Sequence, residues 1–535
     1  MLSQSPTRDE VKPLAPFLSW LRRPVRGAFA AYFTIDPRSL GLCRLGLGAL
    51  LLYDLLRRVP GLSTWYSNQG LLPNHASLSR PGAEYMFSFL FAASRTGEAA
   101  VMFAICGLVF LAFTVGYRTR LFHALSLACI VSLHSRCIFL ENGGDVVLNL
   151  LCAWTLFLPM GARFSVDAIR NSFRARPEKT IAELNDRAAL ATSETAPVAS
   201  LAMLAILLQL SVIYYLNALH KTGWTWRQGV AVHYVLYQER MVTWLGLLAR
   251  DHIPLWLSRR MTYTTYNIEL LAGLLLLNPF FRVWSRRFAV VLLPGLHLAF
   301  AALLNLGQFS FNMIGFYPLL LGARDWELFG RWLGPSAGVG ASAVRMYAPS
   351  PARRWLCRGL ATMRELAVLV VMVALGSQVL VENQAVPQRF KVAQSKWMQQ
   401  IVQYPRLYQG WRMFSADVPT GERMMYVDAV TVTGRHVDPF NEAGARVAAL
   451  PVERIPRHME QDEFFCDYTN RVPDNDTYWQ ALRAWIFDYP RRTQAPENRI
   501  VSFEVKLLEQ DNPPPGEREP RNFRTKVMLR GWEGQ

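Results

Sequence analysis

One lysine stands out because its predicted surroundings would change its acid–base behaviour. Residues 201–219 form a long apolar run that leads directly into His220, Lys221, Trp224 and Trp226. About twenty apolar residues suffice for a helix to cross the hydrocarbon core of a bilayer, so the run places an amine at a lipid boundary. Partial burial disfavours the charged form of a lysine. The pattern predicts that Lys221 acts as a base.

A second interpretation of Lys221 stays open. A lysine at the end of a spanning helix commonly extends toward the lipid headgroups, and the carboxyl-terminal end of a helix favours a positive charge. On that interpretation Lys221 is an anchor, and Trp224 and Trp226 belong to the aromatic belt at the membrane surface.

Four further polar residues lie inside apolar runs, where charge is costly and usually faces a bundle interior or a cavity. They are Arg44, Asp54, Glu269 and His297. Arg44 and Asp54 are separated by about 15 Å along a helix, so each needs a partner elsewhere. Both are interpreted as residues that fasten helices together, and a catalytic role is the alternative. Glu269 and His297 are candidate catalytic or shaping groups beside Lys221. A hydrogen-bonded core histidine is the alternative for His297.

Composition defines the class of protein that must position these residues. Of the 535 residues, 51% are hydrophobic and only 18% are charged, which is typical of a polytopic membrane protein rather than a soluble one. The formal net charge of +17 comes from arginines in the short segments between apolar runs. The excess therefore indicates membrane topology, with the lipid bilayer as partner and no nucleic acid.

The apolar runs predict an all-α polytopic membrane bundle of about nine transmembrane helices, followed by a small C-terminal extramembrane α+β domain. The predicted spans are residues 40–56, 99–117, 121–140, 146–160, 198–219, 266–281, 288–306, 309–321 and 366–381. The predicted units are an N-terminal cytoplasmic segment (1–35), a transmembrane domain (36–381) and an extramembrane domain (382–535).

Arginine placement predicts the orientation, because cytoplasmic loops hold the excess of Lys and Arg. Every second connection is basic, including residues 22–26, 118–120, 163–179, 282–287 and 345–364. The long loop 220–263 is also basic, but the rule weakens for long loops. The pattern places the amino terminus in the cytoplasm and the C-terminal domain on the outer side of the membrane. Lys221 then faces outward.

The C-terminal residues alternate in a way that is typical of strands. We expect strands near 424–433, 501–508 and 523–529, a hairpin turn at 433–435, and a helix over 476–489 that Pro490 ends. Of seven cysteines, only Cys466 lies in this domain, so it has no disulfide framework. The chain also has no paired-cysteine zinc spacing, phosphate loop or nucleophile elbow, and no metal site is predicted.

Several motifs resemble the membrane part of the vitamin K-dependent γ-carboxylases, and more closely their bacterial relatives, the HTTM-domain proteins. The resemblance covers residues 36–326 in matching order. The motifs are Asp36-Pro37-Arg38-Ser39-Leu40 with Arg44 and Asp54, Gly116-Tyr117-Arg118, Phe164-Ser165-Val166-Asp167, Lys221 with Trp226 and Gly229, and His297 with residues 307–313.

This resemblance implies a protein of a bacterial inner membrane, with the C-terminal domain in the periplasm. It also implies a chemistry. In the carboxylases, the lysine that matches Lys221 deprotonates a reduced quinone, whose reaction with oxygen yields a base that takes a γ-proton from a substrate glutamate before carbon dioxide is added. A reduced quinone is therefore the implied cofactor. The family's site opens on the lumenal side, which corresponds to the outer face predicted here.

Two features depart from the family. The carboxylases have a histidine where this chain has Gly144, so glutamate carboxylation itself is in doubt. The C-terminal domain is shorter, and its residues 411–414 resemble the bacterial pattern.

The segment 226–248, semi-apolar and interrupted by charges, is predicted to roof an outer cavity. The candidate lining residues are Asn142, Asp145, His220, Trp226 and Phe309. The leading hypothesis is an outward-facing enzyme that modifies a periplasmic peptide or lipid. The alternatives are a non-catalytic maturation or immunity partner for a secreted peptide, and a transporter, for which the sequence offers no internal repeat.

Overall fold

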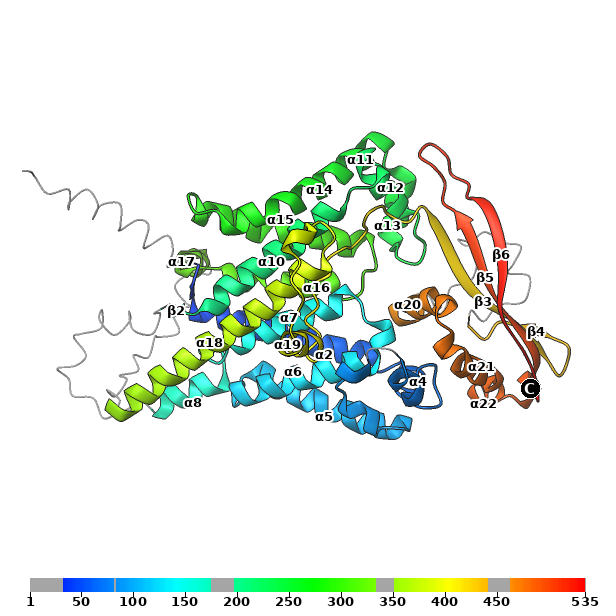
Figure 1. Cartoon of the computed structure of the whole chain (residues 1–535), viewed down its shortest axis with the longest axis horizontal. Coiled ribbons are helices and arrows are strands. Elements are labelled where there is room, and N and C mark those ends of the chain that lie inside the picture. The colour runs from blue at the N-terminus through cyan, green and yellow to red at the C-terminus, as the bar shows by residue number, and fades with distance from the viewer. Residues whose placement is uncertain (1–31, 81–82, 175–196, 333–350, 441–461, 535) are drawn as a thin grey trace, which may run out of the picture.

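The computed structural model describes residues 32–80, 83–174, 197–332, 351–440 and 462–534. The described chain is mostly helical, with a small sheet near its C-terminal end (Figure 1). Most of the predicted cytoplasmic segment 1–35 lies outside these residues, and so do its arginines at 22–26. Figure 1 shows the long helices running along the molecule, with the sheet at one end of the bundle and α8 (Val166–Arg174) and α17 (Ala323–Trp332) at the other.

Each of the nine predicted spans coincides with helical structure. The corresponding elements are α2 (Pro37–Arg58), α5 (Thr96–Val115), α6 (Thr119–Arg136), α7 (Gly143–Leu156), α10 (Leu201–His220), α14 (Leu255–Leu277), α15 (Arg282–Leu303), α16 (Phe309–Ile314) with η5 (Tyr317–Leu320), and α18 (Pro351–Glu382).

Only five described helices are long and apolar enough to cross a membrane: α2, α5, α10, α15 and the Arg358–Glu382 part of α18. The count of nine is therefore not confirmed. The helix α7 and the α16–η5 segment are apolar but short. The helix α14 begins eleven residues before the predicted start at 266, and its added first half carries Arg259 and Arg260, which lowers its hydropathy.

Arg44 has the helix-fastening contacts that its position predicts. Arg44 is fully buried in α2 and donates hydrogen bonds to the carbonyl oxygens of Thr114 at 3.2 Å, Met160 at 3.0 Å and Arg163 at 2.9 Å, and to that of Phe164. These carbonyls come from the end of α5 and the segment after α7. A buried guanidinium needs such partners because each unpaired donor is costly.

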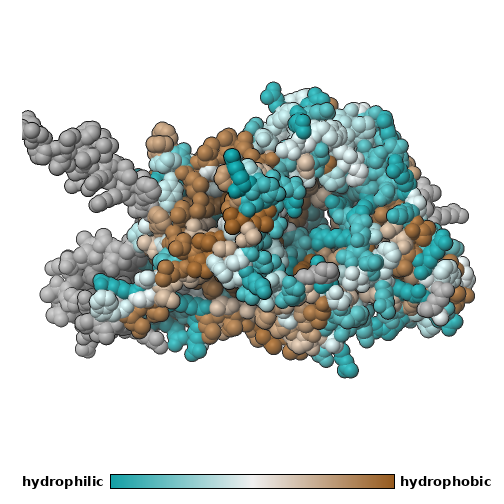
Figure 2. Space-filling view, viewed as in Figure 1, coloured by the Kyte–Doolittle hydropathy of each residue, from teal (hydrophilic) through white to brown (hydrophobic). Residues whose placement is uncertain are grey.

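Short helices cover the end of the bundle that carries the sheet. The predicted roof, residues 226–248, is folded as α11 (Trp224–Arg227), α12 (Ala231–Leu236) and the start of α13 (Trp244–His252). Figure 2 shows hydrophilic residues over this end and hydrophobic residues over the bundle beside it, with a hollow between them. Trp244 and Trp256 are largely exposed, as expected for aromatic residues at a membrane surface.

The C-terminal strands form one antiparallel sheet in the order β4-β3-β5-β6. The strands are β3 (Gly421–Thr431), β4 (His436–Val437), β5 (Ile500–Asp511) and β6 (Arg521–Trp532). The predicted strands 501–508 and 523–529 lie within β5 and β6, whereas β3 ends two residues before the predicted end at 433. Gly434 turns the chain between β3 and β4 with a φ of 77°. The predicted helix over 476–489 is present as α21 (Trp479–Phe487), after a short 3-10 turn.

The C-terminal part packs directly on the bundle. After α18 the chain runs back along the helices, where Gln409 accepts a hydrogen bond of 2.8 Å from Gln209 of α10. Further on, α20 (Glu463–Arg471) docks between the sheet and the bundle (Figure 1). The Phe465 ring lies 4.7 Å from the ring of Trp65. The predicted boundary at residue 382 thus marks the end of α18, and the residues after it remain in contact with the membrane helices.

Candidate functional site

A cavity of about 700 Å³ lies where the bundle, the roof helices and the C-terminal part meet. Most of its wall is apolar, contributed by α10, α12, α14 and α15. The polar residues that line it include Asn142, Asn217, Lys221, Arg240, Arg260, Glu269, His297, Asp417, Glu463 and Asp467. A mostly apolar cavity with a few converging polar groups is the usual form of a small-molecule site.

Lys221 and Glu269 form a buried ion pair in the cavity wall. Lys221 follows the last residue of α10, and Glu269 lies in the middle of α14, which packs along α10. The two side chains are 3% and 9% exposed and are in hydrogen-bond contact. The Nζ atom of Lys221 also lies 4.5 Å from the centre of the Trp226 ring. Lys221 therefore points inward to a carboxylate and an aromatic face, and it does not extend to the headgroups.

The turn after α10 is held by the C-terminal part of the chain. The carboxylate of Asp417 accepts hydrogen bonds of 2.8 Å from both the backbone N–H and the hydroxyl of Thr225. The indole N–H of Trp226 donates to the carbonyl of Phe414 at 2.9 Å. A side chain at Gly223 would overlap the carboxylate of Asp417. Residues 414–417 thus fix the segment that presents Lys221 and Trp226 to the cavity.

His297 is connected to two tyrosines from other elements. Its Nε2 atom lies 2.7 Å from the hydroxyl of Tyr214 in α10, and that hydroxyl lies 2.6 Å from the hydroxyl of Tyr317 in η5. The Nδ1 atom of His297 is buried and has no hydrogen-bond partner among the described residues. The predicted core role of His297 and a role at the cavity are both compatible with this geometry, because one ring nitrogen is bonded and the other is not.

Asn142 and Phe309 line the cavity, as predicted. Asn142 caps α7 by accepting a hydrogen bond of 2.8 Å from the Gly144 backbone, and its Nδ2 atom donates to Glu463. The Phe309 ring lies 5.6 Å from the ring of His297. A Cβ atom at Gly144 would lie only 2.8 Å from the backbone nitrogen of Phe309, so the packing of α16 on α7 leaves no space for a side chain there.

Two other predicted lining residues lie elsewhere. His220 turns back toward its own helix: its Nδ1 atom donates to the Leu216 carbonyl at 2.7 Å, and its Nε2 atom accepts from the Ala385 backbone at 3.3 Å. Asp145 is buried in an ion cluster behind the cavity wall. Both predictions assumed that a polar residue near the outer end of a helix faces the cavity. Backbone hydrogen bonds hold His220 away from the cavity, and ion pairs with two arginines do the same for Asp145.

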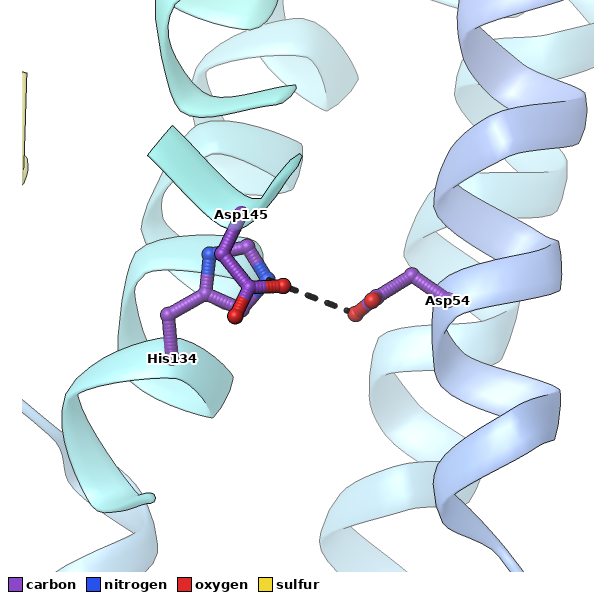
Figure 3. A group of neighbouring side chains, drawn as sticks. All are labelled: Asp54, His134 and Asp145. Atoms are coloured by element: carbon purple, nitrogen blue, oxygen red, sulfur yellow. Dashed lines mark ion pairs between the residues drawn. The ribbon is translucent and has the colours of Figure 1, made fainter. Parts of the chain in front are cut away.

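The ion cluster joins α2, α6 and α7. Asp54 and Asp145 each bond to both Arg57 and Arg58, at distances from 2.8 to 3.2 Å. His134 lies 3.4 Å from both carboxylates (Figure 3). Two carboxylates and a histidine within 4.8 Å have the spacing of a metal site. The two guanidinium groups already supply the compensating positive charge, however, so the cluster is better described as a lock between helices.

The C-terminal helix α20 contributes lining residues that the sequence analysis missed. Glu463, Cys466 and Asp467 line the cavity, and their spacing of three and four residues puts them on one helix face. Burial raises the pKa of Glu463 to about 7, although Arg57 acts in the opposite direction. Burial also raises the pKa of Asp467. Their only sequence signal is this i, i+3, i+4 spacing on a short helix.

Comparisons with protein-family models, with curated proteins and with solved structures found no match to this chain. The function is therefore inferred from the geometry of the cavity.

Proposed function

We propose that this protein is a membrane enzyme whose cavity binds a lipid-soluble ligand and removes a proton from a ligand hydroxyl group. The observation that carries this proposal is the buried ion pair of Lys221 and Glu269 in the wall of a mostly apolar cavity. An ion pair taken out of water is costly to maintain for stability alone, whereas charged groups inside a membrane bundle commonly mark a functional site.

The pair accepts a proton as a unit. A charged ammonium group has no lone pair and cannot accept a proton, so in the ionised pair the acceptor is the carboxylate of Glu269. The ammonium group of Lys221 then stabilises the oxyanion left on the ligand. If the shared proton instead resides on Glu269, Lys221 is neutral and is itself the base. Both arrangements remove one proton from the ligand and leave an ammonium group beside the oxyanion.

The residues present fit a reduced quinone, the cofactor that the family resemblance implies. The cavity has apolar walls and a volume of about 700 Å³, and the unpartnered Nδ1 atom of His297 offers a hydrogen bond to a ligand oxygen. Lys221 and Glu269 would hold a hydroxyl group, and Phe309 would pack against a ring. A bound reduced quinone supplies a weakly acidic hydroxyl and two electrons.

We further propose that the chain is a distant relative of the HTTM-domain proteins, with about nine spans in a bacterial inner membrane. In this arrangement the amino terminus is cytoplasmic, the C-terminal domain is periplasmic, and the substrate is a periplasmic peptide or lipid. The supporting observation is that basic residues of α8 (Val166–Arg174) and α17 (Ala323–Trp332) gather at the end of the bundle opposite to the sheet (Figure 1).

The test uses purified protein in lipid nanodiscs, supplied with reduced naphthoquinone, oxygen and a glutamate-rich peptide. We expect incorporation of labelled bicarbonate that is lost in Lys221→Met. Incorporation by the variant would remove the proposed role of Lys221, and absence of incorporation in both proteins would exclude carboxylation of that peptide. Quenching of Trp226 fluorescence by the quinone, with Trp226→Phe as control, reports binding separately. Absence of both signals would overturn the quinone proposal.

A second candidate function is supported by one feature of the sheet. Strand β6 is the last strand of the sheet order, and most of its residues are exposed, including Phe523 and Val527. An exposed edge strand can bind an extended peptide through its backbone, which suits a maturation or immunity partner of a secreted peptide. Peptide binding that survives Lys221→Ala but not Val527→Pro would favour this function over the enzyme.

A further inference from the structure

Glu463 reaches the cavity from a part of the chain that follows all of the apolar helices. It is the first residue of α20, which also presents Cys466 and Asp467 to the same cavity. The Glu463 side chain is 17% exposed, so it is neither fully buried nor freely hydrated. A ligand in the cavity therefore meets a carboxyl group in addition to the Lys221–Glu269 pair.

Three elements of the membrane part hold this carboxyl group in place. Arg57 of α2 forms an ion pair with it, and the Nδ2 atom of Asn142 donates to it. Gly307, with a φ of 56°, lies directly against it, and a Cβ atom at that position would overlap the carboxyl group. A side chain fixed by partners on separate elements is suited to chemistry because it keeps its orientation when the ligand binds.

The charges around Glu463 allow it to exist in both protonation states. Arg57 and Arg58 favour the ionised form, whereas Asp145 and Asp467 disfavour it. Burial is the largest effect, and it raises the pKa of Glu463 to about 7. A carboxyl group that changes its protonation state near neutral pH is well matched to general acid–base catalysis.

Neither His220 nor His134 brings an imidazole to this part of the cavity, and Gly144 has no side chain. Gly144 cannot carry a side chain beside the backbone of Phe309, and both nitrogens of His220 are engaged by the backbone. His134 lies in the ion cluster with Asp54 and does not line the cavity. Glu463, in contrast, contacts Asn142, only two residues from Gly144.

We propose that Glu463 is a second acid–base residue of the cavity and donates a proton to the anionic oxygen that the reaction leaves on the ligand. This inference rests on the proposed function. In the step, the O–H bond of Glu463 breaks as an O–H bond forms on that ligand oxygen, and no oxidation state changes. The carboxylate that remains is stabilised by Arg57 and Asn142. Water that enters the cavity restores the proton before the next turnover.

The first experiment is infrared difference spectroscopy of the protein in nanodiscs during a pH titration. As pH rises, we expect the carbonyl band of a protonated carboxyl group to disappear with a midpoint near pH 7 in the wild type. Glu517→Gln, which changes an exposed glutamate, is the control and should behave like the wild type. The band should be absent in Glu463→Gln. Addition of reduced naphthoquinone should shift the midpoint. Failure to find the band, or a midpoint that the ligand leaves unchanged, would overturn the proposal.

The second experiment measures turnover against pH. We expect turnover of the wild type to fall above neutral pH, as Glu463 loses its proton. Glu463→Gln should reduce turnover by about 100-fold or more and should not show this fall. Glu463→Asp should retain part of the turnover and part of its pH dependence. Unchanged turnover in Glu463→Gln would overturn the proposal. If the wild type has no turnover, the proposed reaction fails, and the ligand-dependent infrared shift still decides whether Glu463 exchanges its proton beside a bound ligand.

Discussion

The hydroxyl of Tyr214 lies 2.7 Å from Nε2 of His297. The same hydroxyl lies 2.6 Å from that of Tyr317, so a single oxygen joins α10, α15 and η5. The bond decides which nitrogen of His297 is left for a ligand, because a histidine that is engaged at Nε2 presents Nδ1 to its surroundings.

Tyr214→Phe should therefore be more harmful than Tyr317→Phe. The first substitution removes the central hydroxyl and leaves two buried partners unsatisfied, whereas the second leaves the Tyr214–His297 bond intact. Each unsatisfied buried group costs about 1–3 kcal/mol, so we expect a larger fall in thermal stability and weaker quinone binding for Tyr214→Phe. Equal effects of the two substitutions would argue against a central role of this hydroxyl.

Lys221→Met and Glu269→Gln should each destabilise the protein, while the double variant should recover most of the loss. Removal of one partner from a buried ion pair typically costs about 3–5 kcal/mol, because the other charge is left unpaired. Thermal unfolding in detergent measures the effect. Turnover should remain abolished in the double variant. A double variant as unstable as the sum of the single variants would show that the two residues do not interact.

Gly144→Ala should destabilise the protein by about 1–3 kcal/mol, because its Cβ atom would meet the Phe309 backbone at 2.8 Å. Gly143→Ala is a matched control: its Cβ atom would meet only the side chains of Met413 and Phe309, at 3.3 Å or more. Thermal stability of the two variants compares them directly. A stable Gly144→Ala protein would mean that a side chain is tolerated at this position after all.

Asp54→Asn should destabilise the protein by about 3–5 kcal/mol, because it leaves Arg57 and Arg58 with one fewer buried carboxylate. Asp488→Asn removes the carboxylate of an exposed pair, in which the Arg491 side chain is 59% exposed, and should cost less than about 1 kcal/mol. Chemical denaturation of both variants tests the contrast. Similar small losses would mean that the cluster does not fasten the helices.

Glu463 should make the folded protein more stable in mild acid than at neutral pH. Its pKa in the folded protein is raised to about 7 from a usual value of 4.5. The folded state therefore binds the proton more tightly, and the stabilisation is complete below pH 4.5 and is lost as pH rises through 7. Asp462 and Asp467 have raised pKa values as well, so the relevant measurement is the difference in melting temperature between wild type and Glu463→Gln from pH 5 to 8. A constant difference would contradict the expectation.

Local sequence patterns predicted much of the fold and one half of the candidate site. The apolar run before Lys221 places that residue at a helix end, and Glu269 is conspicuous because a carboxylate inside an apolar run needs a partner. Their pairing depends on how α10 packs on α14, and no local pattern specifies that contact. Asp145 shows the limit of such reasoning, because two arginines of α2, 87 and 88 positions earlier in the chain, hold it away from the cavity.

Glu463 could not be predicted for a related reason. It lies 406 positions from Arg57 and 321 from Asn142, and its surrounding sequence resembles any short surface helix. Burial among these distant partners gives the residue its unusual chemistry, so the chemistry becomes visible only when the tertiary contacts are known.

The contribution of α20 to the cavity also has a consequence for the biosynthesis of the protein. A ribosome makes α20 after every apolar helix, so a nascent chain with all its membrane segments inserted still has an incomplete cavity wall. The cavity wall is finished only when α20 has been synthesised and folded back onto the bundle. Chains truncated before residue 463 would thus lack this part of the cavity wall, and the proposed proton transfer would begin only in chains that include α20.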